Sequence, residues 1–132
     1  AMNPWYFAHP HDHQPGGIRL IQYLHTMTGL TFVNPFANQL RVETDGPQLI
    51  VQADLTLIRE AAGLFAWMPR QCALIGTSME VFYANTVVGL PVVIYASPVH
   101  KQHPWLLTFG QVCYYIGDTV DALRNQKAAE GP

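Results

Sequence analysis

Charged residues are scarce in this sequence. Asp, Glu, Lys and Arg together make up 12% of the 132 residues, about half of the roughly 25% found in an average soluble domain. Hydrophobic residues make up 49%, which excludes a disordered chain, because disordered chains are rich in charge and poor in apolar residues. The net charge is -2, so we expect no broad basic surface that binds a nucleic acid polymer.

Cysteines and long hydrophobic runs are also rare. Cys72 and Cys113 are too few for a disulfide framework or a zinc knuckle, which favours a reducing, cytoplasmic location. The longest apolar run, residues 87–96, contains Gly89 and Pro91 and is much shorter than the ~20 residues of a membrane-spanning helix. We therefore expect a cytoplasmic protein without a membrane partner or a secretory signal.

The length favours one domain, residues 1–132, because domains most often have about 100 to 150 residues. A folded domain with so few charges has apolar surface left to cover, and self-association is the common solution. We therefore expect a homo-oligomer. Trp105 is expected in the core or at an interface rather than in a stack with a base.

Short apolar segments alternate with amphipathic segments of helical length. Strands are predicted at residues 5–8, 30–33, 64–68, 91–96 and 112–116, and helices at 17–27, 47–62, 77–88 and 118–128. Residues 36–46 are predicted to be a polar loop. The alternation predicts an α/β fold with a parallel sheet of about five strands and helices on both faces.

In such sheets ligands bind at the carboxyl ends of the strands. We therefore expect the functional residues in the loops after the first, third and fourth strands, which are residues 9–17, 69–77 and 97–104.

Asp54 lies on the apolar stripe of the helix predicted at residues 47–62. Its neighbours three and four residues away are all apolar, whereas a solvated Asp belongs on the polar side. A carboxylate in an apolar site loses hydration and its pKa rises, so Asp54 is expected to hold a proton near neutral pH. The alternative is an Asp at the edge of the helix that accepts a hydrogen bond from a neighbouring loop.

Glu80 allows two interpretations. Thr77 and Glu80 fit a capping box, in which Thr77 caps the helix predicted at residues 77–88 and Glu80 bonds back to the N–H of the cap. Alternatively, the dipole of this mostly apolar helix keeps Glu80 ionised and able to act as a nucleophile. A protonated Asp54 beside a charged Glu80 suits glycosidic bond cleavage, in which one group protonates the leaving fragment and the other attacks the sugar carbon.

Three segments resemble the nucleoside 2-deoxyribosyltransferase family, which includes nucleoside 5′-monophosphate N-glycosidases. They are WYFAHP at residues 5–10, QADLTLIREAAGLFAWM at 52–68 and GTSMEVFYANTVVGLPVVIYAS at 76–97. The resemblance implies a flavodoxin-like three-layer sandwich that forms oligomers with shared active sites. It also implies that Glu80 attacks C1′ of the sugar to form a covalent glycosyl-enzyme, that Asp54 assists departure of the base, and that Tyr6 orients Glu80.

The chain departs from the family pattern at two places. The loop Pro69-Arg70-Gln71-Cys72 lacks the acid that transferases of the family often carry there, and no Asn-x-Met element is found near the C-terminus. Hydrolysis of the glycosidic bond therefore remains an alternative to transfer of the sugar between bases. Arg70, Thr77 and Ser78 offer donors beside a helix N-terminus, where a 5′-phosphate could dock, and the alternative for Arg70 is an exposed surface charge. Gly76 is also expected to contact the substrate.

The loop after the first strand carries His9, His11 and His13 around Asp12. We expect His9 and Asp12 to contact the substrate, with a zinc site and plain loop polarity as the alternatives. Backbone N–H groups at Gly16 and Gly17 can approach a sugar or phosphate. A dinucleotide fingerprint, a P-loop and a serine-hydrolase elbow are all missing from the sequence, so no cofactor and no metal is predicted.

We therefore expect an enzyme that cleaves the N-glycosidic bond of a 2′-deoxynucleoside, a nucleoside or its 5′-monophosphate, and passes the sugar from Glu80 to a second base or to water. One alternative is an N-glycosidase that acts only as a hydrolase on 5′-monophosphates. Another is a binding or sensor module with the same fold and no turnover. A histidine-based metalloenzyme is the third.

Overall fold

Five parallel strands form the centre of the computed structural model, which describes residues 3–38, 40–70 and 72–129, without the side chains of Asp12, Asn38 and Ala129. Their order in the sheet is β2-β1-β3-β4-β5, and each neighbouring pair is parallel. The strands are β1 (Trp5–Ala8), β2 (Phe32–Val33), β3 (Leu64–Met68), β4 (Val92–Ala96) and β5 (Gln111–Cys113).

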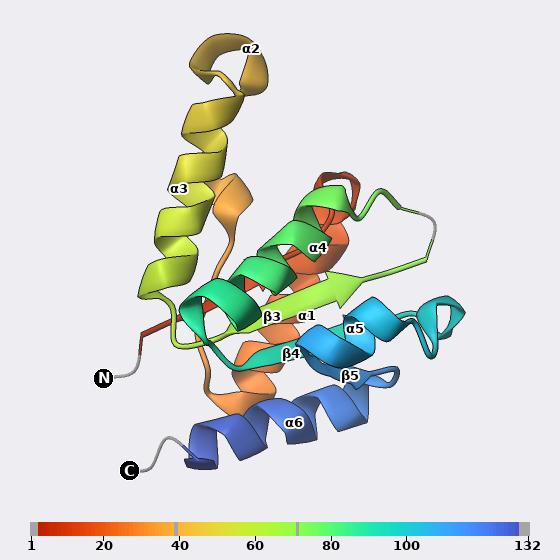
Figure 1. Ribbon diagram of the computed structural model, residues 1–132. Coiled ribbons are helices and arrows are strands. Elements are labelled where there is room, and N and C mark those ends of the chain that lie inside the picture. Colours follow the sequence, from red (N-terminus) through yellow and green to blue (C-terminus); the bar gives the residue numbers. More distant parts are fainter. Residues whose placement is uncertain (1–2, 39, 71, 130–132) are drawn as a thin grey trace.

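Helices cover both faces of this sheet (Figure 1). The α-helices are α1 (Gln14–Thr28), α2 (Val42–Asp45), α3 (Pro47–Glu60), α4 (Ile75–Phe82), α5 (Pro104–Phe109) and α6 (Ile116–Ala129). The 3-10 helices are η1 (His11–His13), η2 (Pro35–Asn38) and η4 (Pro98–His100), and the π-helix η3 (Tyr83–Val88) continues α4. None of the helices in the described residues has both the length and the apolar character needed to cross a lipid bilayer.

The strands alternate between two hydrophobic clusters, one on each face. Trp5 and Phe7 of β1 pack with α1 and α6, whereas Tyr6 and Ala8 pack with α3, α4 and α5. All four side chains are completely buried, as expected for a parallel sheet covered on both sides. Tyr6 therefore faces the layer that contains α3 and α4.

The strand order 2-1-3-4-5 is that of flavodoxin-like sheets, in which the direction of strand addition reverses beside β1. The chain first adds β2 on one side of β1 and then β3 on the other. Such a reversal leaves a crevice at the carboxyl ends of the strands, where ligands bind in open α/β sheets.

Most predicted elements are present, with different bounds at several ends. The second strand is shorter than 30–33, because the end of α1 engages the backbone of Leu30. Its N–H donates to Oγ1 of Thr28, and its carbonyl oxygen lies 2.8 Å from Nδ1 of His25. The fifth strand ends at Cys113 rather than at residue 116, since α6 begins at Ile116.

Two α-helices, α2 and α5, form where the sequence predicted loop. Residues 36–46, predicted to be a polar loop, contain most of η2 and all of α2. The unpredicted α5 begins at Pro104, which suits the first helical position, and the N–H of Trp105 donates to Nδ1 of His103. Figure 1 shows that α2 and the start of α3 project away from the rest of the molecule.

Candidate active site

Tyr6 and Glu80 form the innermost part of the candidate site. The hydroxyl of Tyr6, which has no solvent exposure, donates a hydrogen bond to Oε2 of Glu80. Tyr6 lies in β1 and Glu80 in α4, 74 residues apart in the sequence. Strand alternation points Tyr6 toward the α4 layer, and a buried phenol needs a polar partner. Glu80 is this partner.

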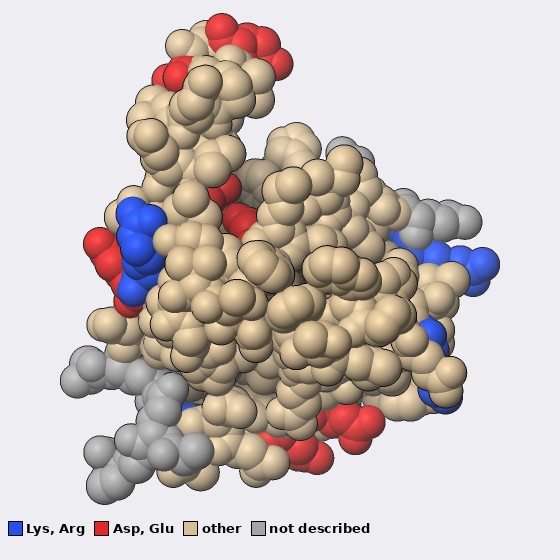
Figure 2. Space-filling view, viewed as in Figure 1, with Lys and Arg blue, Asp and Glu red and all other residues tan. Residues whose placement is uncertain are grey.

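Asp54 and Glu80 line one cavity of about 540 Å³ between α3 and α4, which we call the cleft. Figure 2 shows acidic atoms inside the hollow between α3 and the body of the molecule. The volume lies within the roughly 300 to 1,000 Å³ of small-molecule sites. The two carboxyl groups therefore face a shared space that is large enough for a nucleoside.

Burial raises the pKa of Glu80 to about 8. The hydrogen bond from Tyr6 acts in the opposite direction, and the charge of Asp54 raises the pKa further. Our expectation that the helix dipole keeps Glu80 ionised is therefore wrong for the free site. The dipole acts mainly within the first helical turn, and α4 begins at Ile75, so that Glu80 is its sixth residue.

The predicted capping box is also absent. The residue before the first turn of α4 is Leu74, and no side chain caps this end of the helix. Thr77 lies inside the helix and is buried. The helix starts two residues earlier than the sequence pattern predicted, so Thr77 cannot act as its N-cap.

The pKa of Asp54 is raised as predicted, but our expectation that Asp54 holds the proton at neutral pH is wrong, because the pKa of Glu80 is raised further. Loss of hydration raises the pKa of Asp54 to about 6, which is lower than the pKa of Glu80 because Asp54 is less enclosed by protein. At pH 7 the free cleft thus holds one proton, mainly on Glu80, while Asp54 is mainly ionised. Two interacting carboxyl groups titrate as a pair, so the singly protonated pair is the dominant form between about pH 6 and pH 8.

Tyr6 stays protonated over the working pH range. Burial and the nearby carboxyl groups of Glu80 and Asp54 raise the pKa of its phenol far above the ordinary value. Tyr6 is therefore a fixed hydrogen-bond donor to Glu80.

The loops after β1 and β2 close one side of the cleft. His9 is buried and stacks on Phe7, with ring centroids 4.2 Å apart, and its Nε2 lies 3.1 Å from Oδ1 of Asn34. Burial lowers the pKa of His9, so its ring is neutral at pH 7. The rings of His9 and His11 both lie edge-on to Phe36, at centroid distances of 4.9 and 5.2 Å. These contacts hold Phe36 in the wall of the cleft.

Sequence reasoning missed the loop after β2 and the apolar walls. Phe36 offers an aromatic ring to the cleft, and the other walls come from Pro35, Ile50, Val51 and Met79. A second hollow of about 590 Å³ shares Asp54 and Phe36 with the cleft and extends to Gln14, Arg41 and Glu43. The segment Asn34-Pro35-Phe36 directly follows a strand, and that position was the available signal. The loop after β4 was expected near the site, but its residues do not line the cleft.

The histidine cluster has no metal-binding geometry within the described residues, where no three His, Cys, Asp or Glu side chains are arranged around a common point. His9 and His11 line the cleft. The side chain of Asp12, which we expected to contact the substrate, lies outside the described part of the chain.

Gly16 and Gly17 are not among the residues that line the cleft. A Cβ atom at Gly17 would come within 3.1 Å of Nδ1 of His9 and of Cε2 of Phe7. A Cβ atom at Gly16 would lie 3.1 Å from Cη2 of Trp67. Both glycines therefore allow α1 to pack closely against the β1 loop and β3.

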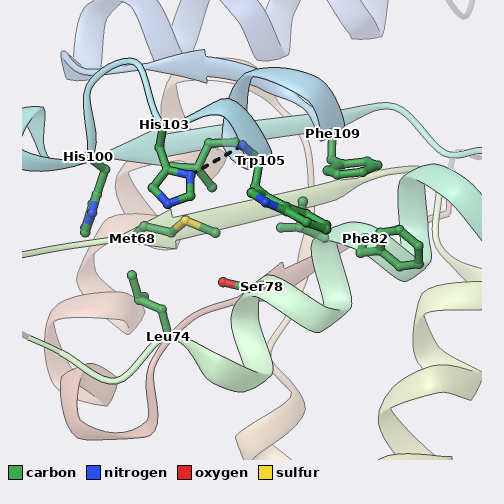
Figure 3. A pocket seen from close by; sticks show the side chains of 10 residues that line it. Met68, Leu74, Ser78, Phe82, His100, His103, Trp105 and Phe109 are labelled. Carbon is green, nitrogen blue, oxygen red and sulfur yellow. Dashed lines mark hydrogen bonds between the residues drawn. The ribbon is translucent and has the colours of Figure 1, made fainter.

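Helix α4 separates the cleft from another cavity. Gly76 and Thr77 line the cleft together with Glu80. Ser78 instead faces a cavity of about 150 Å³ between α4 and α5, shared with His100 and His103 (Figure 3). Ser78 and Glu80 are two residues apart, which places them on different sides of a helix.

Arg70 also lies away from the carboxyl pair. It is exposed and lines a fourth cavity, to which Trp67 and Tyr95 also contribute. Of the four residues expected to bind the substrate near Glu80, the structure thus brings Gly76 and Thr77 to the cleft and directs Ser78 and Arg70 elsewhere.

A solved structure of a 2-deoxyribosyltransferase from the psychrotolerant bacterium Bacillus psychrosaccharolyticus is similar to this chain, with a TM-score of 0.68. The match covers 89% of this chain and 90% of that chain at 21% sequence identity. Neither a protein-family model nor a curated protein matches the sequence. The likeness shows that the two chains share a fold, and it confirms the flavodoxin-like α/β sandwich that the resemblance implied.

Proposed function

We propose that this chain belongs to the nucleoside 2-deoxyribosyltransferase family and cleaves the N-glycosidic bond of a 2′-deoxynucleoside or its 5′-monophosphate. The observation that carries this proposal is the convergence of Asp54, Glu80 and the Tyr6 hydroxyl on one cleft. The shared fold with a 2-deoxyribosyltransferase supports the family. Fold alone does not define chemistry, so the carboxyl pair is the stronger argument.

In the first step a carboxylate oxygen of Glu80 attacks C1′ of the sugar. The bond between C1′ and the base nitrogen breaks, and its electron pair leaves with the base. The base also takes the one proton of the pair, which passes from Glu80 by way of Asp54. The singly protonated pair thus supplies both a nucleophile and an acid, as a retaining glycosidase requires.

In the second step the oxygen of water or the nitrogen of a second base attacks C1′. The incoming group gives its proton to Asp54, and Glu80 leaves as a carboxylate. The proton then returns to Glu80, the more basic member of the pair in the free site. Each carboxyl group therefore ends the cycle as it began.

Tyr6 acts as a positioning residue. Its hydrogen bond fixes one oxygen of Glu80 and leaves the other for attack on C1′. The bond also lowers the pKa of Glu80, because a hydroxyl donor stabilises the ionised form of its acceptor. Both effects favour Glu80 as an ionised nucleophile over its protonated form.

The cleft suits a flat base attached to a sugar. Phe36, Ile50 and Val51 form apolar walls beside Asp54, and an aromatic side chain can stack on a nucleobase. The extension of the cleft toward Gln14 and Arg41 leaves room for a group beyond the nucleoside.

Hydrolysis is the second candidate reaction. The loop Pro69-Arg70-Gln71-Cys72 has no acid, and no Asn-x-Met element is present near the C-terminus. The first departure concerns recognition of the base and the second concerns the contact with the sugar, so water is an acceptor of the sugar beside a second base.

Incubation with 2′-deoxynucleosides and their 5′-monophosphates, followed by chromatography of the free bases, tests the activity. We expect base release by the wild type, none by Glu80→Gln, and unchanged release by Glu60→Gln, which alters an exposed acid away from the cleft. A second base added to the same reactions gives a new nucleoside if the enzyme is a transferase and none if it is a hydrolase. Binding of nucleotides without any base release would instead identify a non-catalytic module.

We also infer that the chain self-associates through the α4–α5 face. We define this face by six exposed side chains, with exposed fractions of 41 to 74%, which are Ile75, Met79, Phe82, Val87, Trp105 and Leu107. The central part of Figure 2, over α4 and α5, shows no charged side chain. Trp105 is thus not a core residue, and the interface alternative is the one that its exposure supports.

The area of this face suits a dimer of identical chains. A large side chain offers roughly 150 to 250 Å², so the six residues expose about 700 Å², close to the roughly 800 Å² that each partner buries in a standard interface. Ile75 and Met79 belong both to this face and to the cleft. A second copy on this face therefore borders the mouth of the cleft.

A further inference from the structure

A cavity of about 240 Å³ lies at the carboxyl ends of β3 and β4 and shares no lining residue with the cleft. Three aromatic side chains, Trp67, Tyr95 and Tyr114, contribute to its walls together with Arg70 and Ser97. The proposed glycosidic reaction uses none of these residues. The cavity therefore needs a separate explanation.

The register of the sheet places two of these rings side by side. Trp67 of β3 pairs with Tyr95 of β4, and both pack on the side of the sheet that α1 and α6 cover. The cleft lies on the opposite side, between α3 and α4. Both cavities use the carboxyl edge of the parallel sheet, which is where ligands bind in this architecture.

Trp67 is held firmly in this position. The ring of His13 lies edge-on to the indole at a centroid distance of 5.8 Å. Gly16 leaves no space beyond it, because a Cβ atom there would come within 3.1 Å of Cη2 of Trp67. A fixed aromatic ring with one side open to a cavity loses little conformational freedom when a planar ligand packs against it.

Arg70 supplies a positive charge at the rim. Its side chain is exposed, and within residues 3–38, 40–70 and 72–129 it has no carboxylate partner. A guanidinium group binds phosphate and carboxylate through two parallel hydrogen bonds. The rim can therefore bind an anionic group while the aromatic walls contact a ring.

We propose that this cavity is a second ligand site, which takes a planar aromatic ring carrying an anionic group. The ring lies against Trp67 and Tyr95, and the anion pairs with Arg70. The volume is below the roughly 300 to 1,000 Å³ of sites for drug-sized ligands, which limits the enclosed part to one ring system. A purine nucleoside 5′-monophosphate and an aromatic carboxylate both have this chemistry.

The site can be tested by the indole N–H signal of Trp67 in nuclear magnetic resonance spectra of the Glu80→Gln protein, in which turnover is blocked. The three tryptophan signals are assigned with Trp→Phe variants. We expect adenosine 5′-monophosphate to shift the Trp67 signal saturably, and benzoate to do so as the aromatic carboxylate. Adenosine without phosphate should bind about tenfold more weakly, and inorganic phosphate alone should leave the signal in place.

Two variants separate this cavity from the cleft. Arg70→Ala should weaken binding of adenosine 5′-monophosphate about tenfold, while Arg59→Ala, which removes an exposed cation on α3, should leave it unchanged. An unmoved Trp67 signal, or equal affinity in Arg70→Ala, would overturn the proposal. So would loss of the shift in Phe36→Ala, because the shift would then arise from the cleft. The Trp67 signal does not depend on glycosidic activity. The experiment therefore tests the second ligand site independently of the proposed function.

Discussion

The hydroxyl of Tyr6 on β1 donates a hydrogen bond to the carboxyl group of Glu80 on α4. This contact links the centre of the sheet to the helix that borders the cleft. It also opposes the effect of burial on the pKa of Glu80. Loss of the hydroxyl should therefore change the protonation of Glu80 without removing any part of the cleft wall.

For Tyr6→Phe we expect kcat to fall roughly 10- to 100-fold, the effect of one hydrogen bond to a charged group, with little change in KM. The pKa of Glu80 rises when the bond is lost, so the descending limb of the pH profile moves to higher pH. Initial rates of base release between pH 5 and pH 10 measure both effects. Tyr23→Phe, on the exposed side of α1, serves as the control. An unmoved limb in Tyr6→Phe would show that Tyr6 has only a structural role.

The profile of kcat/KM against pH should be bell-shaped, with limbs near pH 6 and pH 8. Below about pH 6 both carboxyl groups are protonated, so Glu80 cannot attack; above about pH 8 both are ionised, so no proton is left for the base. The pH dependence of kcat/KM reports the pKa values of the free enzyme. The two limbs therefore reflect the pKa values of Asp54 and Glu80 in the empty cleft.

The same profile for Asp54→Asn should lose its descending limb and fall about 10²- to 10⁴-fold, the usual contribution of a general acid. A descending limb that survives in Asp54→Asn would assign the essential proton to another group.

Phe36→Ala should raise KM by about 5- to 100-fold with a smaller change in kcat, because base stacking on an aromatic ring contributes roughly 1 to 3 kcal/mol. Phe36→Tyr keeps the ring and should keep KM. Steady-state kinetics of both variants provide the measurement. Equal KM values for Phe36→Ala and the wild type would place the base elsewhere in the cleft.

Leu107→Glu should convert the oligomer to monomers, since it introduces a charge into the exposed apolar α4–α5 face. Tyr23→Glu, on an exposed part of α1, should leave the mass unchanged. Sedimentation equilibrium at micromolar concentration determines the mass of each protein. A monomeric wild type would contradict the inferred interface, as would an oligomer that persists in Leu107→Glu.

Local patterns explain where Tyr6 and Asp54 lie within their own elements, whereas the role of Tyr6 was implied only by the family resemblance. A four-residue apolar strand puts Tyr6 on one defined face, and helical spacing puts Asp54 on the apolar stripe of α3. Local rules place Tyr6 and Asp54 within their own elements, but both faces of β1 are buried, so the meeting of the three residues depends on how β1, α3 and α4 pack.

The order in which the carboxyl groups lose their protons could not be predicted from the sequence. It depends on where α4 begins and on how deeply the packing of α3 and α4 removes water from Glu80. Two residues of additional helix were enough to remove the capping box. Burial and neighbouring charge, which are properties of the tertiary structure, then determined the pKa.

The positions of Phe36 and Arg70, which lie in segments predicted to be loops, also could not be predicted from the sequence. Phe36 lies in a stretch without hydrophobic periodicity, so no local rule directs it into the cleft. Arg70 lies two residues after the end of β3, and the path of its loop places it at the cavity beside Trp67. The direction of a side chain in such segments is decided by contacts with distant elements rather than by sequence spacing.

The most direct test is the mass of the intact protein, measured within milliseconds to seconds of mixing with a 2′-deoxynucleoside and quenching in acid. We expect a species heavier by one deoxyribosyl group, with the added mass on the peptide that contains Glu80, and no such species for Glu80→Gln. Base release without any adduct on Glu80, or an adduct on a different residue, would contradict Glu80 as the nucleophile.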